Sequence, residues 1–438
     1  MLEPVNVVGT TPTAAVPPTT AASASSSDSR REVRRLVRST PARMIFLGFV
    51  LILASILTGV VASGAVSDRE GTLDTLLVRT EPLANSAQSL YGALSVADAA
   101  ASTAFLAGGL EPQEVRDRYS QAIGDAGTEL IRASAGLGDT DDDARAALSE
   151  IGAGLPVYTG LVETARSNNR LGNPVGSSYL GEASALMQTS LLPRAEGLYT
   201  DQASRVSTDQ EPFVRPPVLA ILLIVACLIV IVLAQVFLSR RTHRTLNLGF
   251  LGATVMVALL LVWMLVAGLI SATATDRALN RGVAPLQTLT TGFILAQQAR
   301  SDETLNLVRR GSTREYDAEF NENTRKLIEL FDGNDDMTDT LSKWQSAHAR
   351  INGALTIGDF NTAVTVATGS GVADSAAQFR ALDDMLADGI AEARTELRGN
   401  ISRGKTALVG LSSGAVILTV AAAAAIGAGL LPRLREYL

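Results

Sequence analysis

The sequence predicts an all-α membrane protein with four transmembrane helices and two tandem extracytoplasmic four-helix bundles. Four apolar stretches of about 23 residues each contain no charged residue. As a helix, a stretch of that length crosses a hydrocarbon core of about 30 Å. Two long polar segments lie between these stretches and repeat apolar residues at helical spacing. The second half of the chain repeats the order of the first, which indicates duplication of one unit.

The predicted segments follow one another along the whole chain. They are a disordered cytoplasmic tail with a basic juxtamembrane segment (1–43), TM1 (44–66), the first bundle (67–215), TM2 (216–238), a cytoplasmic linker (239–247), TM3 (248–270), the second bundle (271–406), TM4 (407–431) and a cytoplasmic tail (432–438). The start of the chain, 1–29, is rich in Thr, Pro, Ala and Ser. Such a tract buries too little apolar surface to offset the entropy lost on ordering, so we expect disorder there.

Orientation is predicted from the positive charges beside the spans. The segment RREVRRLVRSTPAR at 30–43 contains six arginines and one glutamate. Further arginines lie in the linker and the tail, at Arg240, Arg241, Arg244, Arg433 and Arg435. Short flanks rich in Lys and Arg stay in the cytoplasm, so both termini and the linker are predicted inside and both bundles outside the cell membrane. With a net charge of −7 for the chain and +7 for the three short segments, the two long segments together carry −14.

The first apolar stretch has one alternative interpretation, a cleaved signal peptide. A signal peptide has a short basic start, about 7–15 apolar residues and a cleavage site of small residues. The sequence at Ala62 to Ala65 resembles such a site, but the apolar stretch is longer than this and is preceded by 43 residues. Retention as a membrane anchor is the favoured interpretation.

The composition argues against most enzyme and transport chemistry. The chain has one cysteine, Cys227 inside TM2, and two histidines, His243 and His348, predicted on opposite sides of the membrane. A zinc site of imidazole or thiolate ligands is therefore excluded, and no phosphate-binding loop, nucleophile elbow or kinase motif occurs. We expect no enzyme activity, no metal and no cofactor. Acidic bundles do not suit nucleic acid, and spans without ionisable groups argue against a proton-coupled carrier.

A shift of 203 residues lays the first half on the second. It aligns TM1 with TM3, Pro82 with Pro285, Leu90 with Phe293, and Gly108 with Gly311. Apolar residues from Leu73 to Ala104 recur at steps of three and four, as in a helical bundle. One helix is therefore predicted from 44 to about 107, with a possible kink at Pro82.

Breaks in the pattern divide each bundle into helices. In the first bundle they lie at 136–143 and 167–177, and in the second at 311–312, 332–336 and 358–360. The predicted helices of the first bundle are 112–134, 142–167 and 178–212. The last helix of the second bundle is predicted from about 371, passing through Asn400 and Gly404 into TM4. Each bundle is then an up-and-down four-helix bundle whose end helices enter the bilayer.

Acidic residues cluster at two of these breaks. Asp139, Asp141, Asp142 and Asp143 have the density of a calcium loop but lack the EF-hand spacing. Carboxylates also stabilise a helix N-terminus through its partial positive charge, and this explanation is favoured here and at Asp335 and Asp336.

Several residues are candidates for function. Arg116, Arg118, Arg309 and Arg310 lie near the first bend of each bundle, where guanidinium groups can bind an acidic ligand or partner, although solvated helix faces explain them simply. Arg240, Arg241 and Arg244 are candidates for a cytoplasmic relay. In TM4, Gly410 and Gly414 form a small-residue pair typical of close helix packing.

The architecture resembles the four-helix sensor module of bacterial chemoreceptors, without their cytoplasmic signalling domains. The whole chain resembles the actinobacterial GlnX-type membrane proteins, through RREVRRLVRSTPARM, the helix TEPLANSAQSLYGALSVADAAASTAFLAGG and the linker SRRTHRTLN. This resemblance implies two partners: a solute-binding lipoprotein that binds amino acids outside, and serine/threonine protein kinase G inside. It implies a signal transducer for amino-acid availability. A non-switching envelope scaffold and a transporter are the alternatives.

Overall fold

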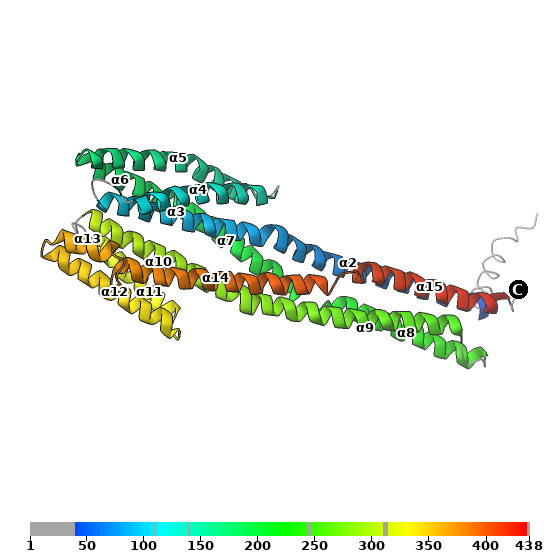
Figure 1. Cartoon of the computed structure of the whole chain (residues 1–438). Helices are drawn as coiled ribbons and strands as arrows, with labels where there is room; N and C mark the ends of the chain where they lie inside the picture. Colours follow the sequence, from blue (N-terminus) through cyan, green and yellow to red (C-terminus); the bar gives the residue numbers. More distant parts are fainter. Residues whose placement is uncertain are drawn as a thin grey trace, which may run out of the picture.

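The computed structural model describes residues 40–107, 111, 113–138, 141–242, 247–309 and 314–435, and in this part of the chain it contains helices and no strand. The predicted disorder of 1–29, and the predictions for Asp139, Arg244 and Arg310, lie outside the described residues. The molecule is long, with the helices of the spans lying side by side at one end and the two bundles side by side at the other (Figure 1). The predicted all-α fold is confirmed.

The helices of the first half form TM1, the first bundle and TM2. They are α2 (Thr40–Thr75), η1 (Leu76–Thr80), α3 (Glu81–Ala107), α4 (Gln113–Gly136), α5 (Asp142–Arg170), α6 (Val175–Leu186), η2 (Met187–Leu191), α7 (Leu192–Gln210), η3 (Glu211–Phe213) and α8 (Val218–Thr242). The second half is α9 (Leu248–Arg277), η4 (Ala278–Val283), α10 (Ala284–Val308), α11 (Glu315–Leu330), α12 (Asp335–Thr356), α13 (Phe360–Thr368), α14 (Ser375–Thr406) and α15 (Leu411–Arg435).

The predicted long helix from TM1 into the first bundle is present, running unbroken over Met44–Ala107. Just before Pro82 it widens into the π-helical turn η1, which ends at Thr80. A proline ring clashes with the carbonyl of the residue four positions earlier, and that residue, Val78, lies inside the π turn. The wider turn accommodates the proline without ending the helix.

The same π-helical turn occurs at the equivalent place in the second half. A shift of 203 carries 76–80 onto 279–283, which lies inside η4, and carries Pro82 onto Pro285. The helix over Leu248–Val308 is likewise continuous. The predicted repeat thus extends to backbone features that the sequence comparison did not use.

The helices that return to the membrane differ from those that leave it. Between α7 and α8 the chain forms the short 3₁₀ turn η3 and then meets Pro216 and Pro217. Between α14 and α15 it forms a turn in which Gly410 has φ +78°. The prediction that the last helix of the second bundle continues into TM4 was therefore wrong, because the chain adopts a left-handed backbone conformation at Gly410.

The second bundle also contains a helix that the sequence did not predict. The break at 358–360 is followed by the nine-residue helix α13, which begins after Asp359. The Asp359 side chain accepts a hydrogen bond from the backbone N–H of Thr362 and caps the helix. The second bundle therefore has one short helix more than four.

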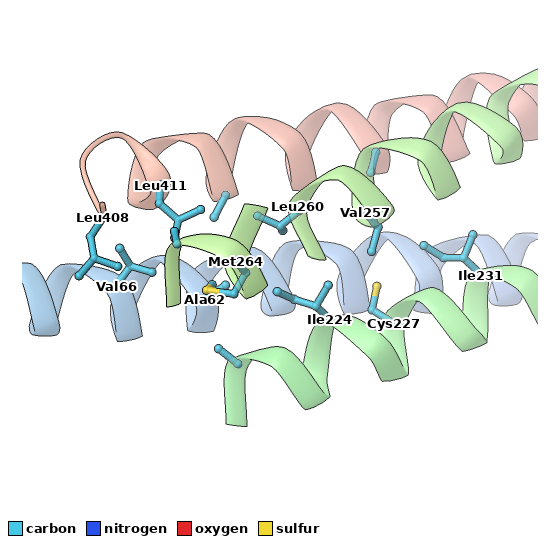
Figure 2. Packing of buried hydrophobic residues seen from close by; sticks show 14 of the residues in the cluster. Ala62, Val66, Ile224, Cys227, Ile231, Val257, Leu260, Met264, Leu408 and Leu411 are labelled. Carbon is cyan, nitrogen blue, oxygen red and sulfur yellow. The ribbon is translucent and has the colours of Figure 1, made fainter. Parts of the chain in front are cut away.

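The four spans pack around a common apolar core. α15 packs along α2 and α9, and α8 packs against the same two helices from the other side. Figure 2 shows part of this core: Ala62 and Val66 of α2, Ile224, Cys227 and Ile231 of α8, Val257, Leu260 and Met264 of α9, and Leu408 and Leu411. The outward faces carry exposed side chains such as Phe46, Leu233 and Leu259. Helices of this length and composition make the chain a multi-pass membrane protein.

Small residues let the spans approach closely, but not the pair that the sequence indicated. A Cβ on Gly414 would lie 2.5 Å from Cζ3 of Trp263, so Gly414 does pack against a neighbouring span. Gly410 lies in the turn, with nothing within 4 Å of its would-be Cβ, and takes no part in packing. Gly249 of α9 lies close to the backbone of α15, since a Cβ there would meet the Ala425 carbonyl oxygen and lie 2.6 Å from Gly429 Cα. The Asn247 side chain adds a hydrogen bond to the Gly429 carbonyl there.

Candidate ligand-binding cleft

A cleft of about 840 Å³ lies between the two bundles. Its floor is formed by α3 and α10, which continue from the first and third spans and pack side by side. Its walls are α4 of the first bundle and α14 of the second. The cleft is therefore formed by both halves of the repeat, and the two helices of its floor lead directly into the membrane (Figure 1).

Small side chains on α3 keep the cleft open. Gly92, Ala93, Ala99 and Ala100 line it. A Cβ on Gly92 would lie 3.0 Å from Cζ of Phe293, the residue aligned with Leu90 by the repeat. A larger side chain at position 92 would therefore displace the Phe293 ring. Polar side chains that both donate and accept hydrogen bonds line the rest, at Asn85, Gln88, Ser89, Gln121 and Gln297.

The walls carry charges of both signs. The α4 wall contributes Arg118, Asp125, Glu129 and Arg132, and the α14 wall contributes Arg380, Asp383, Asp384 and Arg394. Two of these arginines have close acidic partners, because Arg132 pairs with Glu129 and Arg394 pairs with Glu81. Among the described residues Arg380 has no acidic partner, and its Nε donates to the Ala376 carbonyl.

Asp383 shows how burial changes a wall carboxyl. Burial and the nearby charge of Asp384 raise its pKa to about 6, although the hydrogen bond from Gln297 and the charge of Arg118 act in the opposite direction. Gln297 Nε2 donates this bond across 2.7 Å. Arg118 on one wall and Asp383 on the other thus interact across the cleft.

Glu129 has an unsatisfied oxygen at the cleft wall. The residue is 9% exposed, and its Oε1 accepts from Arg132. Its Oε2 is buried and has no hydrogen-bond partner anywhere in the described chain. Leaving such a group unpaired costs about 1–3 kcal/mol or more.

Ion pairs join the cleft to the helices below it. Arg394 lines the cleft and donates to both Glu81 and Asn85 of α3. Arg398 pairs with the same Glu81 carboxylate, whose side chain is 3% exposed. Nearer the membrane, Lys405 lies 2.6 Å from Asp74. These contacts fasten the last helix of the second bundle to the first helix of the first bundle.

The second bundle has a buried polar network behind the cleft. Glu303 is fully buried, and its carboxylate contacts Arg300, His348 and Ser375. Burial alone would raise the pKa of Glu303, but the His348 hydrogen bond and the Arg300 charge outweigh it and lower that pKa. Trp344 donates to Ser375 across 3.0 Å and is, after His348, a second side chain of α12 in the network. Arg300 also lines the cleft, so the network reaches its floor.

The first bundle has a different buried acid. Asp98 is fully buried and accepts hydrogen bonds from Tyr158, Ser184 and Gln188. Burial raises its pKa, and these hydrogen bonds only partly oppose the change. Gln188 also donates to Ser301 of α10, the residue that the 203-residue shift aligns with Asp98. A single side chain thus bridges equivalent positions of the two halves.

The structure separates the arginines that the sequence singled out. Arg118 lines the cleft, whereas Arg116 lies 3.7 Å from Glu111 and does not line it. Arg309 ends α10 with its guanidinium 5.4 Å from the Tyr316 ring centre. Arg240 is exposed near the end of α8, and the Arg241 side chain lies outside the described part. No site among the described residues gathers Arg116, Arg118 and Arg309 together.

Sequence reasoning missed most of the cleft. Glu129, Arg132, Arg380 and Asp383 occur in amphipathic helices whose charged faces look solvated in the sequence alone. Only the packing of two bundles against each other turns these faces toward a common space. The signal that pointed there was the run of small residues on α3, which was interpreted only as part of a helical seam.

These features define a multi-pass helical membrane protein with a ligand-sized cleft at the junction of two bundles. Residues 72–211, from the end of α2 to the end of the first bundle, match the family model of the actinobacterial sensor domain. The match supports an actinobacterial sensor protein. Searches of curated proteins and of solved structures found no match to the chain.

Proposed function

We propose that this protein is a transmembrane signal transducer. It relays extracytoplasmic amino-acid availability, through a solute-binding lipoprotein, to a cytoplasmic serine/threonine kinase of the protein kinase G type. The sensor-domain match supports the sensing role. The resemblance of the whole chain to GlnX-type proteins supports the two partners and the amino-acid signal.

The observation that carries the proposal is the continuity of the cleft floor with two spans. α3 and α10 line the cleft, and each belongs to an unbroken helix that begins in a span. Each of these helices is continuous from the cleft into its span. A ligand or partner that changes their separation at the cleft therefore also displaces their membrane-spanning parts. Shifts of about 1–2 Å between packed helices are sufficient for signalling in known transducers.

The other connections between the bundles and the membrane limit which helices can transmit the movement. The return helices are interrupted at 211–217 and 407–410, so α2 and α9 are the continuous elements. The pairs from Glu81 to Arg394 and Arg398 hold α14 beside α3 just below the cleft. In this proposal the displacement is received inside the cell at the linker, at Arg240, Arg241 and Arg244, and at the basic segment before residue 44.

Deleting the chain in its host tests this function. Cells without it should no longer change the phosphorylation of cytoplasmic kinase substrates when amino acids are added outside, and the intact gene should restore the response. An Arg240→Gln, Arg241→Gln, Arg244→Gln variant should reach the membrane at normal abundance yet fail to restore it. An unchanged response in the deletion strain would contradict signal relay and favour the non-switching envelope scaffold.

A further inference from the structure

The cleft is larger than a free amino acid requires. A volume of about 840 Å³ lies near the upper end of the range of about 300–1,000 Å³ for sites that enclose drug-sized ligands. Along α4 the lining extends from Arg118 to Arg132. Since α4 is helical throughout, these fourteen steps correspond to about 21 Å. The cleft is therefore a groove rather than a compact pocket.

The end of the groove nearer the spans is suited to a cationic amino group. Glu129 presents a buried carboxylate oxygen with no partner among the described residues, and Asp125 lies one turn away on the same wall. Two guanidinium groups also line this end: that of Arg132 contacts the other oxygen of Glu129, and that of Arg394 pairs with Glu81. Because Oε2 is buried, the carboxylate has to rotate before an ammonium group in the groove can supply the missing donor.

The opposite end of the groove is suited to a carboxylate. Arg118 lies 3.8 Å from Glu114, whose side chain is 85% exposed, and such a pair is weak. Arg380 has only a backbone carbonyl as partner in the described chain. Asp383 and Asp384 also line this end, so a ligand carboxylate binds the two guanidinium groups in competition with these two side chains. Two available guanidinium groups can bind a carboxylate in the bidentate manner.

The two ends are too far apart for one amino acid. Arg118 and Glu129 are eleven residues apart on α4, which is about 16 Å along the helix. An extended peptide advances about 3.3 Å per residue, so about five residues span this distance. Gln88, Ser89 and Gln121 also line the groove and can bond to peptide N–H and C=O groups.

We propose that the groove binds a short extended peptide of about four to six residues, with its free amino terminus at Glu129 and its free carboxylate at Arg118 and Arg380. This proposal deepens the proposed sensing role and rests on it, since it names the ligand class of the same cleft. Recognition uses the two termini and the backbone, so it tolerates many peptide sequences.

Native mass spectrometry of the full chain in lipid nanodiscs tests this proposal. The probe is a casein digest fractionated below 1 kDa, mixed with all free amino acids. We expect the protein to retain peptides of four to six residues, and acetylation of the digest to weaken retention at least tenfold. Retention of free amino acids instead, of acetylated peptides equally well, or of nothing would overturn the proposal.

Substitutions test which residues bind the two termini of the peptide. Glu129→Gln and Arg118→Gln should each weaken the binding of a retained peptide about tenfold or more, as measured by titration calorimetry. Arg325→Gln is the matched control, because Arg325 lies outside the cleft on α11 and is as exposed as Arg118. Its binding should be unchanged, and melting curves show whether each variant is folded. Equal binding by all three variants would also overturn the proposal.

Failure of the peptide proposal and failure of the proposed function give different experimental results. If cells respond to free amino acids through this chain but the purified chain retains no peptide, the signal relay is supported and the peptide proposal is rejected. If the purified chain retains peptides but the deletion strain keeps its phosphorylation response, peptide binding by the groove is supported and the kinase relay is rejected.

Discussion

The two bundles begin with equivalent helices, α3 and α10, but differ in their buried chemistry and in the additional helix α13 of the second bundle. At the positions aligned by the repeat, the first bundle has Ala97 and Ala100 where the second has Arg300 and Glu303. All four are buried, so the first bundle packs methyl groups where the second packs an ion pair joined to His348. The π-helical turns below both bundles are nevertheless conserved between the halves. Backbone features that connect to the spans have thus been kept while core chemistry diverged.

The largest expected effect breaks the ion pair of the second bundle. Glu303→Ala leaves the Arg300 guanidinium, 8% exposed, without its carboxylate, and breaking a buried pair in this way costs about 3–5 kcal/mol. Denaturant unfolding in detergent measures this loss. With Trp263→Phe as background, Trp344 inside the second bundle is the only tryptophan that reports it.

The double variant Arg300→Ala, Glu303→Ala sharpens the comparison, because it recreates the alanine pair of the first bundle. It should lose less stability than Glu303→Ala alone, since no unpaired guanidinium remains buried. A double variant as unstable as the sum of the two single variants would show that the bundles do not differ in the way described.

The two bundles should also respond oppositely to pH at their buried acids. The pKa of Asp98 is raised in the folded protein, so its contribution to stability is present below about 3.9 and is lost as pH rises through the raised value. The pKa of Glu303 is lowered, so its contribution is present above about 4.3 and is lost as pH falls.

Melting temperatures between pH 3 and pH 8 measure both effects. Asp98→Asn should reduce the loss of stability on the alkaline side, and Glu303→Gln should reduce the loss on the acidic side while lowering stability at neutral pH. Identical changes in the pH profile from both substitutions would contradict the assignment.

The sequence predicted the elements better than the site because local and tertiary information differ. Uncharged stretches and turn residues located the spans and most helix boundaries, and the acidic residues at the start of α5 and α12 do occupy first turns. The π-helical turns have no residue signature beyond the proline that follows them. Of the cleft, only Arg118 was singled out. Glu129 acquires its role from burial, and Arg380 from its place on a wall opposite α4, which no periodicity within one helix reveals.

Gly410 is another residue whose role could not be predicted from sequence spacing. Its substitution gives the smallest expected change in the free energy of unfolding. Its spacing from Gly414 suggested helix packing, but its φ of +78° identifies a turn that separates α15 from α14. Gly410→Ala should therefore cost about 1–2 kcal/mol, because a Cβ in the left-handed region meets its own backbone. Gly399→Ala is the matched control, since Gly399 lies within α14 with nothing within 4 Å of its would-be Cβ.

That control should instead stabilise the protein by about 0.5–1 kcal/mol, because glycine is unfavourable inside a helix. Thermal unfolding in detergent compares the two substitutions directly. An increase in stability from Gly410→Ala would mean that the helix of the second bundle does run on into TM4. The second half would then have two continuous connections to the membrane where the first half has one, and the similarity of their return helices would be lost.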